Sequence, residues 1–167
     1  GTSHSVELHP EYSRIPINFG NQPSIQSAFI FSQLNRPDLT QFWSRKVAKT
    51  VFGGLSPSTG YNGDEDQGLM GSLAVLIKIG IFQMNGGTEA NSEYQIGSPI
   101  FDEVTIKLNK NFYSGDLFTI KANNNSDANF YVSEAEFNGA SIKANSLRHE
   151  DIVNGGELIL EMTNTVK

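Results

Sequence analysis

The chain has 167 residues, of which 38% are hydrophobic and 10% aromatic, enough for a packed core in one domain or two small packed units. Asp and Glu number 18 against 12 Lys and Arg, so the net charge of −6 offers no electrostatic footprint for nucleic acid or an anionic membrane. The absence of cysteine excludes disulfides and thiolate metal sites. No apolar stretch reaches the roughly 18–20 residues that span a bilayer, and no signal-peptide pattern is visible.

Apolar residues recur at helical spacing in residues 21–36, 39–52 and 66–80 of the first half. The first helix should stop before Pro37, and Asp38 can cap the second. The third is apolar on nearly every side, which indicates a helix buried by neighbours on several sides. Three helices alone would hardly bury it.

From about residue 93 the apolar residues alternate instead, as in half-buried strands. The alternating runs are FDEVTIKL (101–108), DLFTIKA (116–122), NFYVSEAEF (129–137) and GELILEM (156–162). This half predicts an antiparallel sheet or sandwich, joined to the helices through the polar connector 85–93. The expected fold class is therefore α+β, with a helical segment 1–87 and a β-rich segment 88–167.

Three consecutive carboxylates, Asp64, Glu65 and Asp66, lie just ahead of the third predicted helix. The simplest interpretation is helix capping, because the first amides of a helix need acceptors and its dipole favours negative charge there. One acid is enough for a cap, however, and three adjacent acids repel one another. A catalytic role is the alternative, because a loop flanked by glycines can hold one ionised carboxylate as a general base.

A calcium loop of the EF-hand kind is a third interpretation of the same segment. Asn62, Asp64 and Asp66 have the alternate spacing of its first three ligands. The pattern also needs glycine at its sixth position and glutamate at its twelfth, where this chain has Gln67 and Leu73. The EF-hand interpretation therefore fails.

The order of several blocks resembles the C-terminal part of the family 92 glycoside hydrolases, which are calcium-dependent, inverting exo-α-mannosidases. The blocks are FGNQPSIQSAFIF (19–31), GLSPSTGYNGDEDQGLMGSLAVLIKIGIFQMNGG (54–87), EYQIGSPIFDEVTIKL (93–108), ANNNSDANFYVSEAEFNG (122–139) and the H-x-D-I-x-x-G-G of residues 149–156. The Y-x-I-G-S-P-x-F-D pattern at 94–102 is the most specific of them. The resemblance runs from about residue 18 to the end.

This resemblance implies roles for the acidic loop. Asp66 takes the position of the general base, with Asp64 as the partner whose charge raises its pKa. Tyr61, Asn62 and Glu65 become candidate contacts to a mannoside or glycan substrate. The implied fold is the last helices of an (α/α) toroid followed by an antiparallel β-sandwich or sheet.

The resemblance also implies a Ca²⁺ ion, held in part by Asn21 and Gln22, and a parent protein in the periplasm or outside the cell. Gln22 replaces the glutamate of the family pattern, and an amide oxygen is a poorer calcium ligand than a carboxylate. The family's general acid is a glutamate upstream of these blocks, and it has no counterpart here.

Inversion requires two carboxyl groups roughly 6.5–9.5 Å apart, so the chain alone should be inactive. A non-catalytic carbohydrate-binding or scaffold module descended from such an enzyme is the alternative function. Self-association through exposed helical faces is a third possibility.

Overall fold

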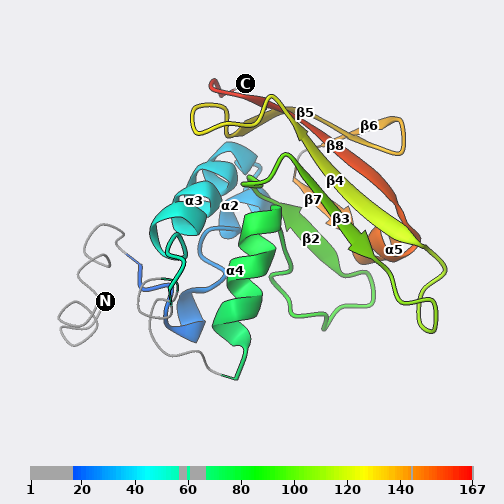
Figure 1. The fold of residues 1–167 in the computed structure, drawn as a ribbon, viewed down its shortest axis with the longest axis horizontal. Coiled ribbons are helices and arrows are strands. Elements are labelled where there is room, and N and C mark those ends of the chain that lie inside the picture. The colour runs from blue at the N-terminus through cyan, green and yellow to red at the C-terminus, as the bar shows by residue number, and fades with distance from the viewer. Residues whose placement is uncertain (1–16, 57–59, 61–66, 144, 167) are drawn as a thin grey trace.

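The computed structural model describes residues 17–56, 60, 67–143 and 145–166. The elements in chain order are η2 (Gln22–Ser24), α2 (Ile30–Gln33), α3 (Pro37–Thr50), α4 (Leu69–Ile79), β1 (Ile81–Phe82), β2 (Glu93–Ile96), β3 (Glu103–Lys107), β4 (Leu117–Asn123), β5 (Tyr131–Phe137), β6 (Ala140–Ile142), β7 (Ser146–Arg148), α5 (His149–Val153) and β8 (Gly156–Thr163). Helices α2, α3 and α4 lie on one side of the molecule, and the two sheets lie on the other together with the short helix α5 (Figure 1). No described helix is long and apolar enough to cross a membrane. The α+β class is confirmed.

The helix predicted over 21–36 is not continuous, and that prediction is wrong. Between η2 and α2 the backbone forms tight turns, in which the amide of Ser27 bonds to the carbonyl of Ser24 and that of Phe29 to Gln26. These are the three-residue bonds of a 3₁₀ turn, which serves short pieces of chain. The turns still bury Ala28 and Phe29, so the apolar residues predicted to face the core do so without a continuous helix.

Helix α3 begins two residues earlier than predicted, with Arg36 at its N-cap and Pro37 at its first position. Proline fits there because its missing N–H would have no partner in a helix. Asp38 lies in the first turn and accepts hydrogen bonds from the Arg36 guanidinium at 2.9 and 2.7 Å. The prediction that Asp38 is the N-cap residue is therefore wrong, although its charge does lie in the first turn of the helix.

Helix α4 packs into two hydrophobic cores. Met70, Leu73 and Ile77 are buried in the helical core. Leu76 packs against both cores, and Ile79 packs against the core of the sheets. One apolar side chain, Val75, stays 58% exposed. The nearly all-round apolar character of this helix is thus explained largely by its place between the helices and the sheets.

The strands form a three-stranded sheet, β1-β2-β7, and a five-stranded sheet, β3-β4-β8-β5-β6. The predicted antiparallel pairing is wrong at one place, because β4 and β8 run parallel. The chain leaves β4, forms β5, β6, β7 and α5, and then inserts β8 between β4 and β5 (Figure 1). A parallel neighbour needs such a long crossover, which strand periodicity does not reveal.

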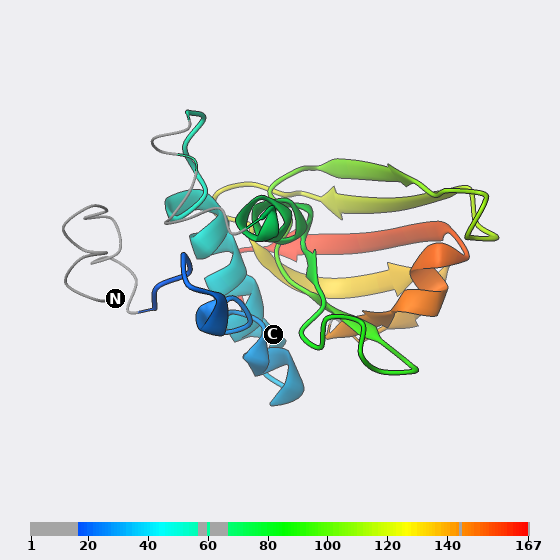
Figure 2. The same cartoon turned by 90° about the horizontal axis from the view of Figure 1, so that it is seen from below.

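The predicted inward faces of the strands are confirmed. The alternating residues Phe118, Ile120 and Ala122 of β4 are buried, as are Leu158, Leu160 and Met162 of β8. The same core includes residues of β1, β2 and β7 from the smaller sheet, and a residue of α5. The view from below places α4 beside both sheets (Figure 2). The division of the chain near residue 87 stays a prediction.

Candidate catalytic loop and the junction that holds it

The five residues predicted to catalyse or to contact substrate lie outside the described residues. They are Tyr61, Asn62, Asp64, Glu65 and Asp66. What the structure describes is the attachment of this loop at each end. The amide of Gly60 donates to the Ser56 carbonyl at 2.7 Å, and a Cβ added at Gly60 would lie 2.9 Å from that oxygen. The loop therefore starts at a tight turn that suits glycine.

The other end of the loop enters α4 through two residues with left-handed backbone. Gln67 has φ 60° and Gly68 has φ 94°. Gly68 is the N-cap of α4, has no side chain, and is followed by a first turn without an acidic residue. None of the three acids is therefore the N-cap residue of α4, and any capping by their side chains lies outside the described residues. In the sequence, the acidic segment precedes this N-cap residue of α4.

The two predicted metal ligands are exposed. Asn21 is the N-cap of η2 and makes no side-chain capping bond, and Gln22 is the first residue of that turn. Calcium takes 6–8 oxygen ligands, and two neutral amides fall well short of that. Among the described residues, no group of three or more His, Asp or Glu side chains could hold a metal.

The Y-x-I-G-S-P-x-F-D pattern at 94–102 forms the junction between the helices and the sheets. Its Gly97 donates its amide to the Gly80 carbonyl at the end of α4, at 2.8 Å. A Cβ added at Gly97 would lie 2.8 Å from Ser44 Oγ and 3.2 Å from the ring of Phe29. Glycine is required here because α3, α4 and the end of β2 approach one another closely.

Ser98, which is 0% exposed, connects three elements at this junction. Its hydroxyl donates to the Phe130 carbonyl at 2.7 Å and accepts from Arg45 Nε at 3.0 Å. Its amide donates to Ser44 Oγ at 3.1 Å. The second branch of the Arg45 guanidinium donates to Asn125 Oδ1. A single serine thus joins α3 to the loop before β5.

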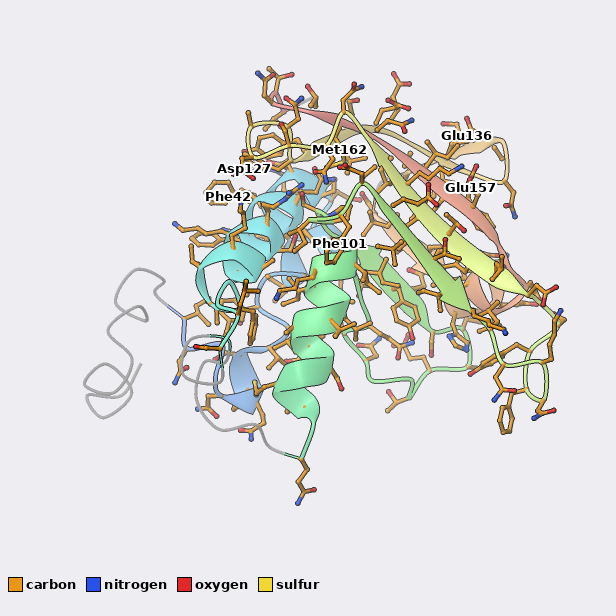
Figure 3. The ribbon with its side chains drawn as sticks, in the orientation of Figure 1. Phe42, Phe101, Asp127, Glu136, Glu157 and Met162 are labelled. Carbon is orange, nitrogen blue, oxygen red and sulfur yellow. The ribbon has the colours of Figure 1, made fainter. Side chains whose placement is uncertain are left out.

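Arg45 is 5% exposed, and its burial lowers the pKa of the guanidinium. Asp127 and Asp102 act in the opposite direction, since their negative charges favour the charged form. Asp127 lies in the loop after β4, above α3 and near Phe42 (Figure 3). Its carboxylate pairs with Lys49 of α3. The β4–β5 loop is therefore held to α3 by both a buried and an exposed charge contact.

The polar contacts that α3 makes at this junction were not predicted from the sequence. Gln41, Ser44 and Arg45 are all buried, although their side chains are polar. Their spacing of three and four residues places them on one helical face. The Gln41 side chain accepts a hydrogen bond from the Val132 amide at 2.9 Å. The polar residues at helical spacing, on a helix that also has an apolar face, were the sequence signal that could have predicted this contact.

Comparison with known proteins identifies the family. A model of the "Glycosyl hydrolase family 92 catalytic domain" matches residues 4–164. The chain belongs to glycoside hydrolase family 92. It is 32% identical over 146 residues to an "Uncharacterized secreted glycosidase" of Arthroderma benhamiae, covering 86% of this chain and 18% of that protein.

Two solved family 92 enzymes of Bacteroides thetaiotaomicron share the fold. The alpha-mannosidase BT3965 is 26% identical with a TM-score of 0.76, over 87% of this chain and 18% of its own. The enzyme described as the Inverting Mannosidase BT2199 is 30% identical with a TM-score of 0.76, over 96% of this chain and 20% of its own. The chain spans about a fifth of the length of these family 92 relatives.

Proposed function

We propose that this family 92 chain is the C-terminal part of an inverting α-mannosidase and carries its general-base loop. The observation that supports this most is the family match over residues 4–164, which runs through the acidic loop. One relative is described as an inverting mannosidase, and another was solved in complex with mannoimidazole. The substrate would be a terminal α-mannoside of a glycan.

The proposed reaction is the attack of water on the anomeric carbon of the mannoside. Asp66 takes a proton from the water as the new carbon–oxygen bond forms on the face opposite the leaving group. The glycosidic carbon–oxygen bond breaks, and its oxygen receives a proton from a carboxylic acid elsewhere in the longer enzyme. Asp64 keeps Asp66 basic by raising its pKa, while Tyr61, Asn62 and Glu65 contact the sugar.

The anchoring of α4 supports a role for the loop in front of it. Gly80 ends α4 with its amide 3.1 Å from the carbonyls of both Leu76 and Ile77. The amide of Ile100, beyond the junction, bonds to the Lys78 carbonyl at 2.9 Å. A helix fixed at its C-terminal end and packed on two cores gives the loop a rigid base, which catalytic positioning requires.

We include Ca²⁺ in this proposal, with Asn21 and Gln22 supplying two amide oxygens. The remaining ligands would come from residues beyond those described here. Bound calcium would supply a positive charge for substrate hydroxyl groups. If this part of the proposal holds, chelation with EDTA should abolish activity and added CaCl₂ should restore it. Turnover that is insensitive to EDTA would remove calcium from the account.

In the longer enzyme, the helices of residues 1–87 would complete an (α/α) toroid, and residues 88–167 would pack against it as a β-sandwich unit. The secreted relative supports a periplasmic or extracellular location. Proton NMR of the first product tests the reaction itself. Release of β-mannose from an α-mannoside supports inversion, and release of α-mannose contradicts it. The isolated 167-residue chain should show no turnover.

A second candidate function is a non-catalytic carbohydrate-binding or scaffold module. Gln22, in place of the family's glutamate, favours it. Two exposed apolar side chains of α2 and its end, Ile30 at 47% and Leu34 at 65%, also allow self-association of such a module. Light scattering of the chain at high concentration tests that contact. A strict monomer would contradict self-association.

A further inference from the structure

A second candidate site lies over the three-stranded sheet. Two cavities, of about 300 and about 380 Å³, flank the 83–92 segment that connects β1 to β2. They adjoin at Glu89 and Asn91, which line both, and we refer to the two together as the groove. Ligand sites in proteins commonly begin at about 300 Å³. No described lining residue comes from residues 54–72, so the groove is built from other parts of the chain than the described ends of the acidic loop.

Side-chain amides dominate the polar lining of the groove. They come from Gln33, Gln83, Asn85, Asn91, Gln95 and Asn145. Each amide both donates and accepts hydrogen bonds, which matches hydroxyl groups that do the same. Within the described part of the chain, no residue hydrogen-bonds the side chains of Gln83 or Asn91. These two amides are therefore available to a ligand.

The charge of the groove disfavours anions. Glu89, Glu93 and Glu150 line it, and Arg148 is the one Lys or Arg among the described lining residues. The Arg148 guanidinium is already engaged by Asp151 through two hydrogen bonds of 2.9 and 2.7 Å. An anionic ligand would meet uncompensated carboxylates. A neutral ligand rich in hydroxyl groups would not.

One end of the groove is built from stacked rings. The Tyr94 and His149 rings stack with centroids 6.0 Å apart, and Tyr113 meets the edge of His149 at 6.3 Å. In the described ranges, the ring nitrogens of half-buried His149 have no hydrogen-bond partner. Burial, with a smaller effect of Tyr113, raises the pKa of Tyr94. Its phenol therefore stays neutral as a donor and acceptor.

We propose that this groove binds a neutral oligosaccharide, as an accessory site apart from the acidic loop. The Tyr94–His149 end provides apolar ring surface and unpaired ring nitrogens, while Asn91 and Gln83 bond hydroxyl groups beside it. This proposal needs neither Asp66 nor the longer enzyme, because every residue it uses is in the described part of this chain.

Titration of the ¹⁵N-labelled 167-residue chain with α-mannotriose, followed by NMR, tests the groove. We expect saturable shifts centred on the amides of Asn91, Ser92 and His149. Asn91→Ala should weaken binding at least about fivefold, the effect of one lost hydrogen bond. Asn164→Ala, an exposed position near the C-terminus, is the matched control and should bind as the unchanged chain does.

Four results would overturn the proposal. The first is the absence of any shift at 20 mM mannotriose, about the weakest affinity that a carbohydrate site of this kind would show. The second is a set of shifts centred on residues 60–68, which would assign binding to the acidic loop. The third is equal binding of the anion trigalacturonate, because the carboxylates of the groove should exclude it. Unaltered affinity in Asn91→Ala would equally contradict it.

Discussion

Arg45 Nε of α3 and Ser98 Oγ of the junction lie 3.0 Å apart in the interior, although 53 residues separate them in the sequence. This contact joins the helical half of the chain to the sheets. The same serine also holds the Phe130 carbonyl at 2.7 Å. Because Ser98 is 0% exposed, water cannot readily replace either bond. The junction that supports α4, and with it the acidic loop, depends on this polar contact.

Ser98→Ala should destabilise the fold. It leaves a buried guanidinium N–H and a half-buried carbonyl without their partner, which costs about 1–3 kcal/mol of the free energy of unfolding. Urea denaturation followed by circular dichroism measures this. The exposed helix residue Ser72 provides the control, because Ser72→Ala should change the stability little. Equal stability of the two variants would show that the Arg45–Ser98 contact is unimportant.

Gly97→Ala should also destabilise the chain, but by overpacking. Its new methyl group would meet Ser44 Oγ at 2.8 Å, and such crowding costs about 1–3 kcal/mol. In a Ser44→Ala background that oxygen is gone, so the same substitution should cost less. A double-mutant cycle gives the coupling. Additive effects of the two substitutions would argue against a direct clash.

Asp38→Asn should lower the urea midpoint slightly at pH 7 and hardly at all in strong acid. The hydrogen bonds from Arg36 hold the pKa of Asp38 below its ordinary range. The unfolded state therefore takes up the proton first as the pH falls. The stabilisation is present above the ordinary pKa and disappears as the pH drops through the lowered folded value. A difference between the proteins that stays constant from pH 7 to pH 2 would contradict this.

The alternating runs predicted β3, β4, β5 and β8, because side-chain alternation is a local property, but not the short strands β1, β2, β6 and β7. The run around Phe118 and Ile120 needs no knowledge of its neighbours to be recognised as a half-buried strand. The parallel pairing of β4 with β8 is different, since it depends on where the chain returns to the sheet 38 positions later, at Gly156 opposite Phe118. The alternating strands were therefore predictable, whereas their order in the sheet was not.

The junction shows the same contrast. The Y-x-I-G-S-P-x-F-D pattern pointed to the family, and the family is confirmed. The pattern did not predict that this segment joins the helices to the sheets. Ser98 makes that connection by hydrogen bonds to Arg45, Ser44 and Phe130, which come from distant parts of the chain. The prediction of a helix over 21–36 was wrong because tight turns bury Phe29 as well as a helix would. The roles of Asp64 and Asp66 stay predictions.

The most direct test of the proposed mechanism is Asp66→Asn in the full-length enzyme that contains this chain. Loss of a general base should reduce kcat/KM for an aryl α-mannoside by about 10²–10⁴-fold. Gln67→Asn is the matched control, because asparagine tolerates the left-handed backbone at this position and should leave turnover unchanged. We predict a severe loss in the first variant alone. Undiminished mannoside hydrolysis by Asp66→Asn would contradict the assignment of the general base.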